Sequence, residues 1–335
     1  LAGLEGIAIG ETLADPEHPQ PLPPIQVEEP TVHMTFGVNT SPFSGREGQW
    51  GTSRKIRQRL FDELRTNVAL RVVESDTPDS FPVSGRGELH LAILIETLRR
   101  EGYEFQVSRP DVILKQDSSG KILEPFEDVY IETSPDAAGV VVEMLGARHG
   151  IMKNMVNTTT GTVRLEFLVP TRGLLGFRSQ FLSSTRGDGV IHTLFHGYLP
   201  YSGDFSERSS GSLVAFEAGV TTTFGLKNAE ERGTLFYGAG VPVYAGMVIG
   251  KYQRPGDLDI NVCKKKELTN MRAANADKEI RLTTPTHLSL EEAIEYLGKD
   301  ELLEVTPLAY RIRKQQLSAH ERGRLTKTAK KAALE

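Results

Sequence analysis

The chain has 335 residues, of which 39% are hydrophobic and 25% charged, and it contains a single cysteine, Cys263. This length predicts two or three domains, and one cysteine excludes an internal disulfide and a multi-cysteine metal or iron–sulfur site. Because the sequence has no run of about 18 apolar residues, it predicts no membrane-spanning helix, and we expect a cytoplasmic protein.

The charge is distributed unevenly. Residues 311–331 contain eight basic residues and one acid, a net +7, which leaves −12 for the rest of a chain whose total is −5. A basic tail on an acidic body favours a polyanionic partner, most simply a nucleic acid. From charge alone, a solvated end whose lysines only maintain solubility is an equal alternative.

Residues 1–30 do not have the pattern of a complete domain. Residues 4–9 suit one strand, and residues 15–24 contain five prolines, which is typical of a stiff, extended linker. We therefore expect the tail end of a truncated domain, followed by a proline-rich linker.

Residues 31–115 have the pattern strand, helix, strand, strand, helix, strand. Apolar periodicity, a capping serine at Ser53 and turn residues predict these elements at residues 32–38, 53–64, 68–73, 81–84, 89–100 and 103–107. Gly102 suits the end of the second helix, since glycine takes up the left-handed conformation there without strain. The βαββαβ order predicts a ferredoxin-like domain.

Residues 122–200 repeat this order. Ser134 followed by Pro135 signals a helix start. Strands are predicted at residues 129–133, 151–157, 163–169 and 189–198, with a second helix at residues 174–184. Residues 81–89 and 167–175 also match at five of nine positions, and in both a strand ends in an Arg-Gly turn before a helix. The sequence therefore predicts two copies of one sandwich.

Residues 201–335 have a different pattern. Apolar segments between glycine-rich turns predict strands at residues 213–216, 234–237, 243–250, 258–263 and 304–312, and a capping box at Ser289 opens a short helix. The predicted fold class is α+β, with two ferredoxin-like βαββαβ sandwich domains followed by a β-rich C-terminal domain with long loops.

The sequence carries no catalytic or nucleotide-binding signature. It contains no phosphate-loop motif, nucleophile elbow or zinc-protease motif. His192 and His196 have a spacing that suits one face of a strand, but a metal would need further ligands that the sequence does not indicate, so we expect no metal site.

Basic residues are the remaining candidates for function. Lysine and arginine neutralise phosphates, and asparagine and arginine also bond bases and sugar hydroxyls. The predicted RNA-binding residues are Lys264, Lys265, Lys266, Asn270, Arg272, Lys278, Arg311, Arg313, Lys314, Arg322, Arg324 and Lys327. Alternation along a strand places Arg311 and Arg313 on one side, about 7 Å apart. Residues 322–331 suit either a basic helix or a disordered arm, and a solvated loop without a partner is the alternative for the lysine run.

Basic residues near helix ends form a second set. Backbone N–H groups at a helix start favour anions, although an arginine paired with a neighbouring carboxylate fits equally well. The further candidate contacts are Arg86, Arg148, His149, Arg172, Arg178 and Arg186.

Seven segments resemble the BipA/TypA family of bacterial translational GTPases, which is related to elongation factor G and LepA. They are FSGREGQW (43–50), SGRGELHL (84–91), PTRGLLGFR (170–178), STRGDG (184–189), VYAGMVIG (243–250), DLDINVCKKKELTNMR (257–272) and EVTPLAYRIRK (304–314). The GRGELH turn is shared across the elongation-factor group. The KKKELTNMR segment is similar to the domain that is unique to the BipA/TypA family.

The resemblance implies an identity for each part. Residues 1–30 would be the end of a β-barrel domain plus a linker, 31–115 and 122–200 would correspond to domains III and V of elongation factor G, and 201–335 would be the family-specific RNA-binding domain. GTP and Mg²⁺ are expected in an N-terminal domain outside this chain. The resemblance therefore implies no catalytic residue, no cofactor and no activity of the chain's own.

The resemblance also implies partners. It implies a monomer that docks on the A-site region of the 70S ribosome through 23S rRNA and the acceptor end of the A-site tRNA, with no membrane partner. The family acts in stress response, virulence regulation and ribosome assembly. Two other classes of function stay open: a protein-interaction scaffold whose basic tail has no RNA role, and a hydrolase with a site in residues 201–250.

Overall fold

The computed structural model describes residues 12–23, 29–75, 77–159, 161–204, 210–265 and 281–332. The chain divides into two compact units. Unit 1 comprises Leu1–Val38, Gly48–Phe105 and Pro110–Phe205, and unit 2 comprises Asn39–Glu47, Gln106–Arg109 and Ser206–Glu335. Within the described ranges, no helix combines the length and the apolar character needed to cross a membrane.

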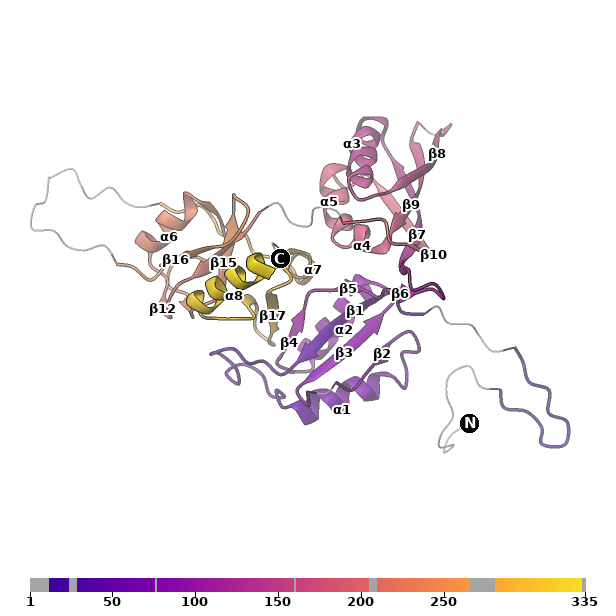
Figure 1. The fold of residues 1–335 in the computed structure, drawn as a ribbon, viewed down its shortest axis with the longest axis horizontal. Coiled ribbons are helices and arrows are strands. Elements are labelled where there is room, and N and C mark those ends of the chain that lie inside the picture. Colours follow the sequence, from indigo (N-terminus) through magenta and orange to yellow (C-terminus); the bar gives the residue numbers. More distant parts are fainter. Residues whose placement is uncertain are drawn as a thin grey trace, which may run out of the picture. The chain divides into compact units, whose positions relative to one another are not determined.

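The first part of unit 1 is an antiparallel sheet with two helices (Figure 1). Its elements are β1 (Val32–Gly37), α1 (Ser53–Glu63), β2 (Arg71–Val72), β3 (Ser80–Gly85), α2 (Glu88–Arg100) and β5 (Asp111–Val112), together with β4 (Phe105–Ser108), whose first residue belongs to unit 1 and whose other residues belong to unit 2. The strand order is β4-β1-β3-β2, and β5 pairs with β1. Phe36 and Phe105 stack in the core with their ring centroids 5.7 Å apart. The predicted ferredoxin-like order is confirmed.

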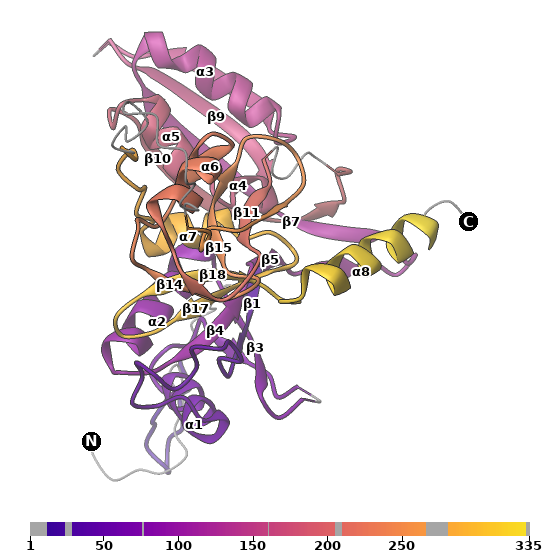
Figure 2. The ribbon, with the colours of Figure 1, turned by 90° about the vertical axis from the view of Figure 1, so that its left-hand side faces the viewer.

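The second part of unit 1 repeats this architecture. Its elements are β6 (Lys115–Gln116), β7 (Ile122–Thr133), α3 (Pro135–Gly146), β8 (Ile151–Asn157), β9 (Val163–Pro170), α4 (Thr171–Leu174), α5 (Phe177–Ser184) and β10 (Val190–Pro200). The strand order β10-β7-β9-β8 is that of the first sheet, and β6 pairs with β7. Figure 2 shows α3 lying along this sheet. Val129, Leu145 and Phe167 belong to the core between α3 and the strands.

Two predictions in unit 1 are wrong in detail. The single helix predicted at residues 174–184 is broken into α4 and α5, because Gly176 takes up the left-handed conformation at φ 69° and donates its N–H to Glu88 Oε2 at 3.1 Å. The strand predicted at residues 68–73 shrinks to β2, since Leu70 donates to the carbonyl of Asn67 in a turn.

Unit 2 combines a mixed four-stranded sheet with smaller elements. Its elements are β11 (Ser212–Ala215), β12 (Gly219–Val220), α6 (Thr223–Glu230), β13 (Gly233–Leu235), β14 (Pro242–Val243), β15 (Val248–Tyr252), β16 (Leu258–Ile260), α7 (Leu290–Tyr296), β17 (Glu301–Val305), β18 (Tyr310–Lys314) and α8 (Ala319–Ala332). The sheet order is β13-β15-β11-β16, while β12 pairs with β14 and β17 with β18. Leu213, Leu226 and Ile249 lie in its core.

Two features of unit 2 differ from the sequence predictions, and a third decides between the two alternatives for residues 322–331. The strand predicted at residues 304–312 is a hairpin of β17 and β18, because the hydroxyl of Thr306 accepts the N–H of Ala309 at 2.9 Å and closes a turn. Helix α6 was not predicted; Thr222 caps it by accepting the N–H of Gly225 at 3.0 Å. The segment at residues 322–331 lies in a helix, α8, and the capping box at Ser289 is confirmed.

Candidate RNA-binding surface

The cations of β18 lie inside the protein. Arg313 is 2% exposed, and its guanidinium donates to Thr40 Oγ1 at 2.7 Å, to Gln106 Oε1 at 2.5 Å and to the carbonyl of Lys314 at 3.0 Å. The partners Thr40 and Gln106 come from the two short segments of unit 2 that are distant in sequence. These bonds commit Arg313 to holding those segments against β18.

Arg311 belongs to the same buried network. Its guanidinium bonds Glu47 and lies 3.6 Å from Glu304, a fully buried carboxylate that also accepts the hydroxyl of Tyr244. Burial raises the pKa of Glu304 and lowers the pKa of Arg313, because each loses solvation of its charged form. The charges in this network are therefore compensated internally.

Lys314 is 1% exposed and carries the third internal cation. Its ammonium bonds Asp257 and lies 3.0 Å from both Asp300 and Glu301. Burial pushes the pKa of Lys314 down, but the carboxylates of Glu301, Asp257 and Asp300 together raise it above its ordinary value. Lys314 is thus a charged structural residue with three acidic partners.

The prediction that these three cations bind RNA is therefore corrected. Arg313 and Lys314 have almost no solvent-exposed surface. The side chain of Arg311 is 12% exposed and is paired with Glu47. Pulling Lys314 out to meet a phosphate would leave Glu301 buried without a counter-charge, and pulling out Arg311 and Arg313 would do the same to Glu304, which is strongly unfavourable. We remove Arg311, Arg313 and Lys314 from the predicted RNA-binding set.

Lys264 and Lys265 lie at the surface. They follow β16, and both are exposed. The carbonyl of Lys264 accepts the hydroxyl of Thr222, the cap of α6, so the main chain is fixed where the side chains project. The other predicted residues of this segment, Lys266, Asn270, Arg272 and Lys278, lie outside the described residues.

Helix α8 supplies a second exposed group, Arg324 and Lys327. Arg322, at the start of the helix, bonds Asp259 of β16 and donates to the carbonyls of Gln316 and Leu317 at 2.9 and 2.7 Å. Its side chain is 13% exposed, so Arg322 acts mainly as an anchor. The two exposed groups are consequently attached to the same strand, β16. The sequence analysis did not identify Asp259 as the partner of Arg322. The only sequence signal for this pairing is an acidic residue within the short strand β16.

Among the candidates in unit 1, Arg172 is used internally. Its guanidinium bonds the fully buried carboxylate of Glu124, donates to Ser202 Oγ at 3.1 Å and lies 4.3 Å from the ring centroid of Tyr201. His149 has φ 60° and its Nδ1 lies 2.8 Å from the carbonyl of Ser202. Of the two alternatives for Arg172, anion binding at a helix start or pairing with a neighbouring carboxylate, the structure contains the pairing with a carboxylate.

The remaining candidates of unit 1 are more exposed. Arg148 is half-buried and donates to Gln180 Oε1 at 2.7 Å and to the carbonyl of Met144 at 3.1 Å. Arg86, Arg178 and Arg186 are exposed. No contact in the structure tests whether they meet RNA, so they stay predictions.

The two strand histidines are not brought into a metal-binding cluster. His196 Nδ1 lies 2.8 Å from Asp128 Oδ2, and Lys153 Nζ bonds the other carboxylate oxygen at 2.8 Å. These contacts lower the pKa of Asp128, Lys153 first and His196 second. Within the part of the chain that the structure describes, no three metal-ligating side chains come together. The exposed cations Lys264, Lys265, Arg324 and Lys327 have the chemistry to pair with phosphates.

Comparisons with known proteins match both units. The model "Elongation factor G C-terminus" matches residues 121–209, and the model "TypA/BipA C-terminal domain" matches residues 210–319. The chain is 51% identical over 314 residues to the large ribosomal subunit assembly factor BipA of Synechocystis sp., which covers 94% of the chain and 52% of that protein. It is 47% identical over 335 residues to the Bacillus subtilis protein of the same name, covering 100% of the chain and 55% of the relative. The chain thus spans about half the length of these relatives.

Proposed function

The chain belongs to the BipA/TypA family, and from this premise we propose that it is the ribosome-binding part of a factor that acts in assembly of the large ribosomal subunit. GTP hydrolysis, with Mg²⁺, would be performed by a domain outside this chain. The chain itself would hold the factor on 23S rRNA near the A site and the acceptor end of the tRNA. Roles in stress response and virulence regulation would follow from this ribosomal activity.

One observation carries this proposal: four exposed cations of unit 2, Lys264, Lys265, Arg324 and Lys327, are connected to one strand, β16. Lys264 and Lys265 come four and five residues after the end of β16, and Arg322 ties the helix bearing Arg324 and Lys327 to Asp259 of β16. Cations held on a common support suit the regularly spaced phosphates of folded RNA, and each pairing releases counterions. Binding should therefore weaken steeply as salt rises.

The test is co-sedimentation of the chain with purified large ribosomal subunits over a series of salt concentrations. For the variant Lys264→Ala/Lys265→Ala, we expect weaker binding and a slope of log affinity against log salt that is smaller by about one for each cation–phosphate pair that the substitutions remove. The variant Arg324→Ala/Lys327→Ala should act in the same direction.

A matched control removes two exposed cations from another part of unit 2, in the variant Lys251→Ala/Arg254→Ala. It should leave the slope unchanged. Salt-insensitive binding, or an equal loss with the control variant, would contradict RNA docking through this surface. Binding that survives removal of the rRNA by nuclease would instead favour a protein partner.

A further inference from the structure

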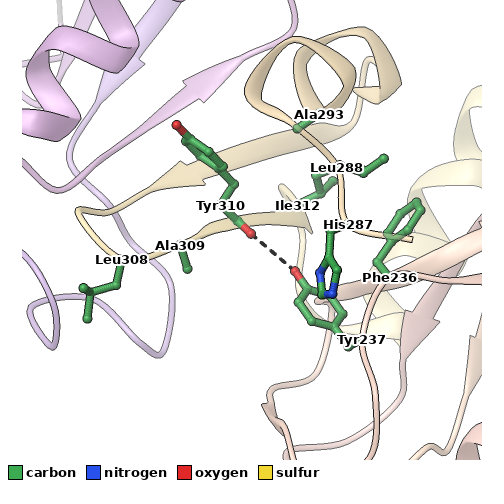
Figure 3. Close-up of a pocket in the computed structure, with 9 residues that line it drawn as sticks. All are labelled: Phe236, Tyr237, His287, Leu288, Ala293, Leu308, Ala309, Tyr310 and Ile312. Atoms are coloured by element: carbon green, nitrogen blue, oxygen red, sulfur yellow. Dashed lines mark hydrogen bonds between the residues drawn. The ribbon is translucent and has the colours of Figure 1, made fainter. Parts of the chain in front are cut away.

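Unit 2 contains a cavity of about 310 Å³ that the proposed cationic surface does not use. It lies between the turn joining β17 to β18 and the segment that leads into α7 (Figure 3). Its aromatic lining residues are Phe236, Tyr237, His287 and Tyr310. Figure 3 shows the ring of His287 beside that of Tyr237, with Leu308 at the other end of the cavity.

The walls of this cavity are held in place. Phe236 is 8% exposed and packs edge-to-face on Tyr296, with ring centroids 5.2 Å apart. The hydroxyl of Tyr237 donates to the carbonyl of Tyr310 at 3.4 Å, and the N–H of Thr286, next to His287, donates to the carbonyl of Leu235 at 2.8 Å. A cavity supported in this way is preformed for a ligand.

The chemistry of the lining selects a neutral, planar ligand. The described lining residues include no lysine, arginine, aspartate or glutamate, so a phosphate or a carboxylate would find no counter-charge inside. Aromatic faces stack planar rings, and the exposed imidazole of His287 can donate or accept a hydrogen bond at the edge of such a ring.

Leu308 adds an unusual feature at the rim. Leu308 is 79% exposed, although it follows Pro307 in the turn that Thr306 closes through Ala309. A large apolar side chain presented on a fixed turn suits a wedge that packs against an unstacked base. The fold itself makes no use of this exposed surface.

We propose that this cavity receives a single unstacked nucleobase of RNA, with its sugar and phosphates left outside. The inference rests on the proposed function, because the exposed cations of the same unit, Lys264, Lys265, Arg324 and Lys327, favour a polyanionic chain over an apolar protein segment. The cations would supply affinity for phosphates, and the cavity would add a contact that depends on the base.

The first experiment measures fluorescence anisotropy with two labelled RNA octamers, an oligoadenylate and the same sugar-phosphate chain without bases. The variant His287→Ala/Leu308→Ser changes two exposed side chains, so its fold should be retained. We expect it to lose about tenfold in affinity for oligoadenylate, the size of one base–aromatic stack. Its affinity for the abasic chain and its salt slope should stay unchanged.

The variant Lys264→Ala/Lys265→Ala separates this inference from the proposed function. It should reduce the salt slope for both octamers, because it removes phosphate-binding cations and leaves the cavity intact. An unchanged affinity of His287→Ala/Leu308→Ser for oligoadenylate, or an equal loss on both octamers, would overturn the base site while leaving the cationic surface standing.

A second experiment keeps the inference testable if the chain binds neither octamer. Adenosine has no phosphate, and its titration should shift the methyl resonances of Leu288 and Ile312 in the wild-type chain and not in His287→Ala/Leu308→Ser. An absence of shifts in the wild type would overturn the proposal. Shifts with N-acetylphenylalanine amide and none with adenosine would assign the cavity to a protein side chain, and would also overturn it.

Discussion

Lys314 in β18 and Lys264 after β16 are both lysines of unit 2, but they have opposite surroundings. Lys314 is 1% exposed among Asp257, Asp300 and Glu301, whereas Lys264 is exposed at the surface. A buried ammonium stays with its acidic partners because separating them would leave a buried charge unpaired, which is unfavourable in free energy. An exposed ammonium is solvated by water, and its charge stays available for a ligand. Burial therefore decides whether a cation is committed to the fold or left available for the proposed contact with RNA.

The largest expected effect comes from removing a buried cation. Lys314→Met leaves Glu301, a fully buried carboxylate, without its ammonium partner. We expect the free energy of unfolding to fall by about 3–5 kcal/mol. Urea titration followed by circular dichroism measures this, with Lys265→Met as the exposed control, expected within about 0.5 kcal/mol of wild type. Equal losses of stability for the two substitutions would contradict the claim that the buried lysine stabilises the fold and the exposed one does not.

An analogous pair extends the comparison to unit 1. Arg172→Ala removes the partner of the buried carboxylate of Glu124, so we expect a loss of about 3 kcal/mol in the free energy of unfolding. Arg178 is an exposed arginine in the neighbouring helix α5, and Arg178→Ala should change stability by no more than about 0.5 kcal/mol. A loss below about 1 kcal/mol for Arg172→Ala would show that Glu124 can be satisfied without its arginine.

The smallest expected effect is on how the free energy of unfolding depends on pH below about 5, through the carboxylate of Glu230. Glu230 accepts bonds from Lys227 Nζ at 2.7 Å and from both the N–H and the hydroxyl of Thr283 at 2.6 Å, and Lys227 first and Thr283 second lower its pKa to about 2. Because the folded-state pKa lies below the ordinary value of 4.5, this contribution is present above pH 4.5 and is lost as the pH falls toward 2.

The measurement compares wild type with Glu230→Gln. The difference between their urea midpoints should shrink as the pH is lowered from about 5 to about 3, since Glu230 takes up its proton in the unfolded chain before it does so in the folded one, and this proton uptake favours unfolding of the wild type. The other titrating groups are common to both proteins and cancel in the difference. A constant difference over this range would mean that the carboxylate charge of Glu230 contributes nothing.

The order of elements was predictable because the signals that set it are local. Alternating apolar residues at positions 32–38 and the helical spacing of Ile56 and Leu60 each lie within one element, and both βαββαβ orders followed. The break at Gly176 was not predictable, since nothing in the sequence distinguishes a glycine with positive φ from one inside a helix. The hairpin turn at residues 306–309 carried a signal in Pro307, but it contains no glycine and lies within an apolar run, so the two strands were predicted as one.

The roles of the basic residues were only partly predictable. The cationic tail is visible in composition, but whether a given cation is buried depends on partners far away in sequence. Arg311 bonds Glu47, 264 residues earlier, and Arg313 bonds Gln106, 207 residues earlier. Their alternation in β18 was real, yet the side they share faces those partners. Long-range pairing of this kind leaves no periodic signal.

The most direct test of this account is lysine acetylation footprinting of the chain, alone and bound to large ribosomal subunits. The account predicts that Lys264, Lys265 and Lys327 are modified in the free chain and protected in the complex, while Lys251 is modified equally in both and Lys314 in neither. A Lys314 that is modified in the free chain and protected on the subunit, with Lys264 and Lys265 unaffected by binding, would contradict it.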